Sequence, residues 1–210
     1  MSKRKPRRLR DERADETRST LLQAAAALFE ERGYAGTSLD DVAATARTTK
    51  GAVYHHFSDK RALFREVYDA LAAKTAERVV REVATRPGRG VPVDRTQLGD
   101  AMMKRALRAY LREAAVGSGR RVLFQEGMTV LGGNECRAID AKHGLGLIQQ
   151  LVETVGDPAL LRAAGSDVIS RLLLALIIEA GSIIGGASDP ARTTKQVERV
   201  MLRALAILRG

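Results

Sequence analysis

The sequence predicts an all-α protein that has a small N-terminal helix-turn-helix domain followed by a larger helical domain. Apolar residues recur at helical spacing along most of the chain, and no β-type alternation interrupts them. The stretch Thr37 to Phe57 has the length and pattern of two short helices joined by a tight turn. With 210 residues, the chain is long enough for one small and one larger core.

Residues 1–14 precede any apolar periodicity, and we predict that they form a disordered basic arm. Its basic side chains are Lys3, Arg4, Lys5, Arg7, Arg8 and Arg10. Residues 1–65 carry 14 basic and 9 acidic side chains, which gives +5 of the total charge of +10. Such an arm can follow phosphates or enter a minor groove, and the alternative is a solvated tail that aids solubility.

A first helix is predicted over residues 16–32, where Gly33 is a suitable terminator. The next helix is short, with Thr37 as its cap and Asp40 as the residue that reaches back to it. Arg47 and Thr48 then form the turn.

Thr49 is the expected cap of the second short helix, which begins at Lys50. Val53 and Phe57 lie four residues apart and can pack inward together. The residues left for the outer faces are Lys50, Gly51, Ala52, Tyr54, His55 and His56. A positive N-terminus, a glycine and a phenolic hydroxyl on one helix suit contact with a DNA groove. The segment therefore predicts a DNA-binding protein, and the sequence pI near 10.2 agrees.

This segment resembles the N-terminal domain of TetR-type transcriptional regulators over roughly residues 15–68. The resemblance is carried by GYAGTSLDDVA at 33–43 and by Gly51, Val53, Tyr54, His56, Phe57, Lys60 and Leu63. It implies an all-helical homodimer that represses transcription and leaves a palindromic operator when a small molecule enters the C-terminal domain. It also implies phosphate contacts from Ser38, Thr49, Lys50, Tyr54, His56 and Lys60, and base contacts from Gly51, Ala52 and His55.

The turn departs from the family pattern, which commonly has Gly then Val where this chain has Arg47 and Thr48. If that first position needs a positive φ, a residue other than glycine is strained there. Arg47 can instead add a phosphate contact, so both turn residues join the candidate DNA-binding set. We expect the DNA-binding domain to span 15–65 and the effector-binding and dimerisation domain to span 66–210.

Helical patterns continue over 60–84, 96–116, 120–131, 135–155, 158–164, 166–186 and 191–208, with a flexible loop over 86–94. The apolar run 168–184 is interrupted by Arg171 and Glu179 and is too short for a membrane span, so we predict a buried helix. The last two helices are the expected dimer interface. Its candidate residues are Leu172, Leu176, Ile183, Val197, Met201, Ala204, Leu205 and Leu208.

An effector pocket is expected among the helices of the second domain, lined by adaptable thioethers and apolar rings. The candidates are Met102, Met103, Leu107, Tyr110, Phe124, Met128, Leu147 and Glu179. Each apolar one can equally be an ordinary core residue. Glu179 lies in an apolar helix and needs a partner, so it can pair across a dimer or anchor a largely apolar ligand.

Enzymes are disfavoured because no nucleophile elbow, phosphate loop or zinc-protease motif is present. Adjacent His55 and His56 point about 100° apart on a helix, which disfavours joint metal ligation, and no cofactor is predicted. Cys136 is the only cysteine, which fits a reducing cytoplasm. Two functions remain: an effector-controlled repressor, or a constitutive or architectural DNA-binding dimer without an effector.

Overall fold

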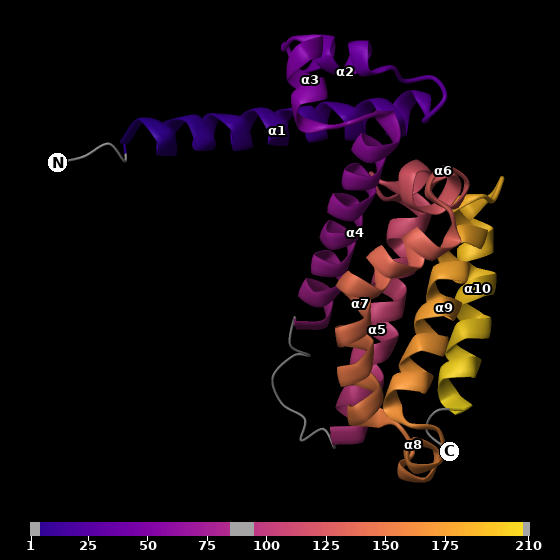
Figure 1. Ribbon diagram of the computed structural model, residues 1–210. Helices are drawn as coiled ribbons and strands as arrows, with labels where there is room; N and C mark the ends of the chain where they lie inside the picture. The colour runs from indigo at the N-terminus through magenta and orange to yellow at the C-terminus, as the bar shows by residue number, and fades with distance from the viewer. Residues whose placement is uncertain (1–4, 85–94, 208–210) are drawn as a thin grey trace. The chain divides into compact units, whose positions relative to one another are not determined.

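The computed structural model describes residues 5–84 and 95–207, which form helices and no strands, so the all-α prediction is confirmed (Figure 1). The chain divides into two compact units, Met1–Ala70 and Leu71–Gly210. The predicted loop at 86–94 lies outside the described residues.

The first unit contains α1 (Lys5–Arg32), α2 (Leu39–Thr45), α3 (Lys50–His56) and the start of α4 (Lys60–Ala84). Its core is made of apolar side chains from all four helices: Leu21, Leu28, Phe29, Val42, Val53, Phe57, Leu63 and Phe64. Phe29 and Phe64 meet edge to face, with ring centroids 5.1 Å apart. This core holds the two short helices against the two long ones.

The helix α1 begins at Lys5, which corrects the predicted disordered arm over 1–14. Residues 1–4 lie outside the described residues. Apolar spacing does not indicate this part of the helix, but residues 5–14 consist mainly of residue types with good helix propensity. Pro6 lies in the first turn, where a missing N–H is tolerated. The end of α1 is as predicted, since Gly33 follows it with φ 77°.

The second unit contains the end of α4, then α5 (Arg95–Val116), a π-helix η1 (Arg121–Glu126), α6 (Gly127–Leu131) and α7 (Gly133–Val155). It ends with α8 (Pro158–Ala164), α9 (Ser166–Gly185) and α10 (Pro190–Ile207). The helices α5, α7, α9 and α10 pack around a common core that includes Leu111, Val152, Ile184, Met201 and Leu205.

The predicted helix over 120–131 is divided in the structure, because its first part forms the π-helix η1. This turn lies against the end of α9, where the side chains of Arg120 and Gln125 both donate to the carbonyl of Gly185, at 2.8 and 2.6 Å. A Cβ at Gly185 would lie 2.4 Å from the Cβ of Phe124. Only glycine therefore admits η1 at this distance from α9.

The helix α9 is, within the described ranges, the one helix long and apolar enough by length and composition to cross a membrane. A core helix of a soluble protein meets the same criterion, and α9 packs against α5, α7 and α10. The sequence predicted a buried helix, but only its inner face is buried. Its outer face exposes Leu172, Leu176 and Ile183, because none of the described helices covers that side.

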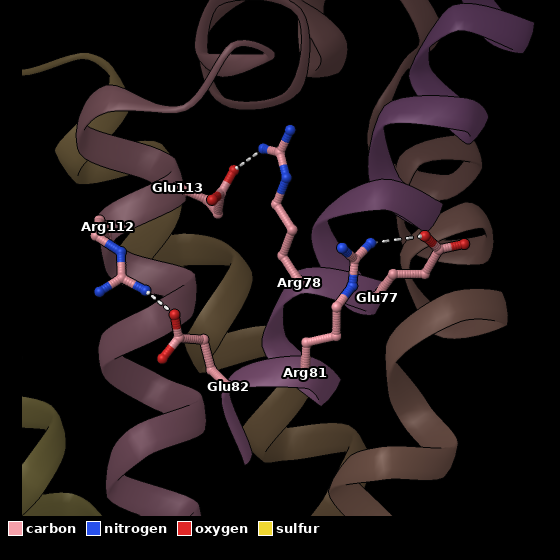
Figure 2. A network of polar contacts seen from close by, with 6 residues as sticks. All are labelled: Glu77, Arg78, Arg81, Glu82, Arg112 and Glu113. Atoms are coloured by element: carbon pink, nitrogen blue, oxygen red, sulfur yellow. Dashed lines mark hydrogen bonds and ion pairs between the residues drawn. The ribbon is translucent and has the colours of Figure 1, made fainter. Parts of the chain in front are cut away.

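Two ion pairs connect α4 to α5 within the second unit (Figure 2). The guanidinium of Arg78 contacts the carboxylate of Glu113, and that of Arg112 contacts Glu82 at 2.9 Å. The Glu113 side chain is largely buried, so its pair is less screened by solvent than an exposed one. An exposed pair contributes only about 0.2–1 kcal/mol. These contacts fix the position of α4 on α5 more than they stabilise the fold.

Candidate functional site

The first helix of the predicted helix-turn-helix motif is capped by Ser38, one residue later than the sequence predicted. The Ser38 hydroxyl accepts a hydrogen bond from the Asp41 backbone N–H at 3.1 Å, and the Ser38 N–H donates to the Asp41 carboxylate at 2.9 Å. The hydrogen bonds from Ser38 lower the pKa of Asp41. Thr37 is instead buried and donates to the carbonyls of Leu28 and Gly33. Asp40 is not part of this capping box.

Arg47 occupies the left-handed region, with φ 53°. It is the one non-glycine residue with positive φ in the described part of the chain. The turn therefore does require the conformation that glycine adopts most easily, as the departure from the family pattern suggested. The Arg47 side chain is exposed and Thr48 is half-buried. A hydrogen bond from the Thr48 N–H to the Ala43 carbonyl, at 2.9 Å, stabilises this turn.

The helix α3 has the cap and the inner face that the sequence predicted. The Thr49 hydroxyl accepts from the Ala52 N–H at 3.2 Å, and Val53 and Phe57 are buried. Lys50, Gly51, Tyr54 and His55 are exposed, whereas Ala52 and His56 are half-buried. A Cβ at Gly51 would meet one atom of the chain within 4 Å, the Thr49 hydroxyl oxygen at 3.8 Å. The protein itself therefore does not require glycine there.

Lys50 forms an ion pair that the sequence analysis missed. Its ammonium lies 2.9 Å from the carboxylate of Asp40, which raises the Lys50 pKa through a hydrogen bond and charge. The two residues are ten positions apart, so no local spacing rule connects them. They lie on a groove of about 530 Å³ that Ser38, Tyr54 and Lys60 also line.

Lys60 makes contacts within the protein in addition to its predicted role in contacting phosphate. Its ammonium donates to the carbonyls of Tyr34 and Thr37, at 2.9 and 3.0 Å. It also lies 4.2 Å from the centroid of the Tyr34 ring, within range of a cation–π interaction. These contacts leave one of its three N–H donors for a phosphate. No local pattern indicates these contacts, because they depend on the packing of α4 against the loop after α1.

Among the described residues, no group of three or more His, Cys, Asp or Glu side chains could hold a metal ion. The rings of His55 and His56 lie edge to face, with centroids 5.2 Å apart. The pKa of His56 is lowered, mainly by burial and then by the nearby His55 and Arg18. His56 is therefore neutral at neutral pH, and it can accept or donate one hydrogen bond.

Most of the predicted effector-site residues lie together inside the second unit. Met103 and Leu107 belong to its buried core, and the side chains packed against that core include Met102, Tyr110, Phe124 and Leu147. Two predicted members lie apart from this cluster. Met128 is exposed on α6, and Glu179 is exposed on the outer face of α9. Helical periodicity could not assign them, because both faces of these helices carry apolar residues.

The predicted interface residues divide between the inside and the outside of the chain. Leu172, Leu176 and Ile183 are exposed on α9, while Val197 and Ala204 on α10 are half-buried. Leu208 lies outside the described residues.

Met201 and Leu205 were also expected at the interface, but both are buried in the core of their own chain. Val200 and Ile207 are the exposed apolar residues of α10. We name the exposed apolar residues Leu172, Leu176, Ile183, Val200 and Ile207 the outer face.

Two family models cover most of the chain. Residues 21–67 match the model described as bacterial regulatory proteins, tetR family. Residues 101–208 match the model described as tetracyclin repressor-like, C-terminal domain. The second match alone spans more than half of the chain.

Curated relatives and a solved structure agree with these models. The Transposon Tn10 TetC protein of Escherichia coli is 27% identical over 157 residues, which are 75% of this chain and 74% of that protein. The HTH-type transcriptional regulator AcrR of Shigella flexneri is 34% identical over 113 residues, 54% of this chain and 48% of its own length. A crystal structure of a TetR-family regulator from Pectobacterium atrosepticum superposes with a TM-score of 0.75 at 28% identity, covering 94% of this chain and 96% of the other.

Proposed function

The chain belongs to the TetR family of transcriptional regulators, and from this membership we propose that it is a homodimeric repressor that a small-molecule effector releases from a palindromic operator. Regulators of this family are non-enzymatic DNA-binding proteins. The palindrome, the dimer and the effector are the steps that we propose for this chain. We also propose that it acts in the cytoplasm, where the genome lies.

The observation that carries the proposal is the exposed polar surface of α3. Lys50, Tyr54 and His55 are exposed along it, while Val53 and Phe57 fix the opposite face in the core. A helix held in this way can enter a major groove with its N-terminus toward the backbone. Lys50 and Tyr54 are suited to phosphate contact, and His55 is suited to contact a base edge.

The outer face supports dimerisation. Its residues are large and apolar, and they lie on two antiparallel helices joined by a short connection. Monomeric proteins rarely expose large contiguous apolar patches, so exposed large apolar side chains on two helices that pack together favour an interface. A two-fold dimer would cover it with the same surface of a second copy and repeat α3 at about 34–36 Å for successive major grooves.

A route for effector control runs through α5. This helix carries Met103, Leu107 and Tyr110 toward the internal cluster, and two residues further it carries Arg112, which pairs with Glu82 of α4. The helix α4 continues into the DNA-binding unit. A ligand that shifts α5 would therefore act on α4 and favour one spacing of the two α3 helices over another.

The experiment is selection of binding sites from random duplex DNA, followed by titration of the selected site at several salt concentrations. We expect a pseudo-palindrome, and an affinity that falls steeply with salt. Lys50→Ala should weaken binding to all sequences alike and reduce the salt slope by about one. Lys195→Ala removes an exposed lysine from α10 and is the matched control.

An asymmetric selected site, or an unchanged salt slope in Lys50→Ala, would contradict the proposed placement of α3. Effector control is tested separately, by adding a compound library to the complex with the selected site. If compounds bind the protein without releasing DNA, the constitutive alternative is the correct function.

A further inference from the structure

The groove beside α3 carries negative as well as positive charge. Its lining includes the four side chains that are expected to contact phosphate here, which are Ser38, Lys50, Tyr54 and Lys60. It also includes three carboxylates, those of Asp40, Asp41 and Asp59. A carboxylate repels the phosphates of DNA, so each of the three needs a reason for its position on this surface.

Two of these carboxylates cap helices. Asp41 accepts from the backbone N–H of the residue that precedes α2, at 2.9 Å, and Asp59 accepts from a backbone N–H in the first turn of α4, at 2.7 Å. Asp40 makes a different contact. Both of its carboxylate oxygens lie 2.9 Å from the ammonium of Lys50. The role of Asp40 is therefore to be sought in what it does to Lys50.

The ion pair between Lys50 and Asp40 does little to hold the domain together. The two side chains are 59% and 63% exposed, and exposed ion pairs contribute little to stability on average. The helices that the pair connects, α2 and α3, already bury Val42 and Val53 in the core of the first unit. The pair therefore matters mainly for what Lys50 can bind.

Asp40 and a DNA phosphate compete for the same ammonium. Both are anions that accept hydrogen bonds from a lysine, and the hydrogen bond and charge of Asp40 already raise the Lys50 pKa. A phosphate on Lys50 would lie within a few ångströms of the Asp40 carboxylate, where the two negative charges repel each other. Full contact with phosphate therefore requires Lys50 to leave Asp40.

We propose that Asp40 restrains Lys50, holding its ammonium in the free protein and giving it up when a DNA phosphate binds. The restraint lowers the affinity for every DNA sequence, because phosphate contacts carry no sequence information. It thereby limits non-specific binding by a chain with a net charge of +10. This inference rests on the proposed placement of α3 against DNA. It adds Asp40, which the sequence analysis assigned to a helix cap, to the residues that determine DNA affinity.

A double-mutant cycle tests this exchange of partners. The four proteins are the full-length wild type, Asp40→Asn, Lys50→Ala and the double variant, and the probe is a fluorescent DNA duplex of random sequence. Removing the carboxylate should raise affinity in both backgrounds, because it removes repulsion of the DNA. If the ion pair breaks on binding, the rise should be about two- to fivefold larger where Lys50 is present, which is the range of an exposed pair. This extra factor should shrink at high salt.

The matched control is Glu77→Gln. Glu77 forms an exposed ion pair with Arg81 outside the first unit, and the substitution changes the net charge by the same amount as Asp40→Asn (Figure 2). It should leave DNA affinity close to that of the wild type. Thermal melting identifies any variant that fails to fold. If Asp40→Asn does so, Asp40→Ser takes its place in the cycle, because serine suits the N-terminal end of a helix.

An equal rise in the two backgrounds would overturn the restraint, because the ion pair would then persist on DNA. As large a rise in Glu77→Gln as in Asp40→Asn would also overturn it, because net charge would then explain the effect. Lys50→Ala tests the placement of α3 itself. If it weakens binding while the two rises are equal, the placement stands and the restraint fails. If it leaves affinity unchanged even in the Asp40→Asn protein, the placement fails and the restraint fails with it.

Discussion

Two neighbouring residues of α10 should respond to the same substitution in opposite ways. Val200 is 65% exposed on the outer face, and Met201 is 5% exposed in the core of its own chain. Changing either to Glu introduces the same charge, one peptide bond apart. We expect Val200→Glu to prevent dimerisation without unfolding the protein, and Met201→Glu to unfold the second unit.

The magnitudes follow from where each side chain lies. Truncating a buried Met costs about 2–5 kcal/mol, and an unpaired carboxylate adds several kcal/mol of desolvation, so Met201→Glu should lose at least about 5 kcal/mol. That loss approaches the whole stability of many domains. Val200→Glu should change monomer stability by about 0.5 kcal/mol or less. A two-fold interface would bury the new charge twice, and about 2 kcal/mol per copy weakens the dimer nearly a thousandfold.

Urea denaturation followed by circular dichroism gives the stability, and sedimentation velocity gives the oligomeric state. Lys195→Glu changes an exposed residue of the same helix and should leave both measurements close to wild type. Equal stability of Met201→Glu and Val200→Glu would contradict the burial of Met201 in the core of its own chain. A Val200→Glu dimer of unchanged affinity would contradict an interface at the outer face.

Three further changes test the first unit. Arg47→Gly should stabilise the first unit by about 0.5–1 kcal/mol in urea denaturation, since glycine adopts φ 53° without strain. A loss of stability in this variant would show that contacts of the Arg47 side chain compensate for the strain. Lys60→Met should lower the stability of the first unit by about 1–3 kcal/mol, because it removes two charged hydrogen bonds. Lys50→Met is the control and should change stability little, because its ion pair with Asp40 is exposed. Equal losses of stability in the two variants would contradict this difference between the two lysines. The lowered pKa of His56 means that the folded state binds its proton less readily than the unfolded chain. Stability should therefore fall as the pH drops below the ordinary value of 6.5, and His56→Gln should flatten this dependence in urea denaturation at pH 7.5 and 5.5.

The sequence by itself determined the helical class, most helix bounds in the second unit and the two faces of α3. These features depend on interactions within a few residues: the Thr49 cap, the pairing of Val53 with Phe57, and the glycine at 33 that ends α1. Local hydrogen bonds and helical spacing act over one or two turns, so they can be inferred without the rest of the chain.

The tertiary structure alone decided which apolar side chains are covered and which polar groups meet. An amphipathic pattern indicates that Met201 lies on an apolar stripe, but not whether its own chain or a second copy covers that stripe. The ion pair between Lys50 and Asp40 and the close approach of Phe124 to Gly185 likewise have no local signal. Each depends on the packing of helices that are distant in sequence, and that packing is set by the summed fit of many side chains rather than by any one spacing.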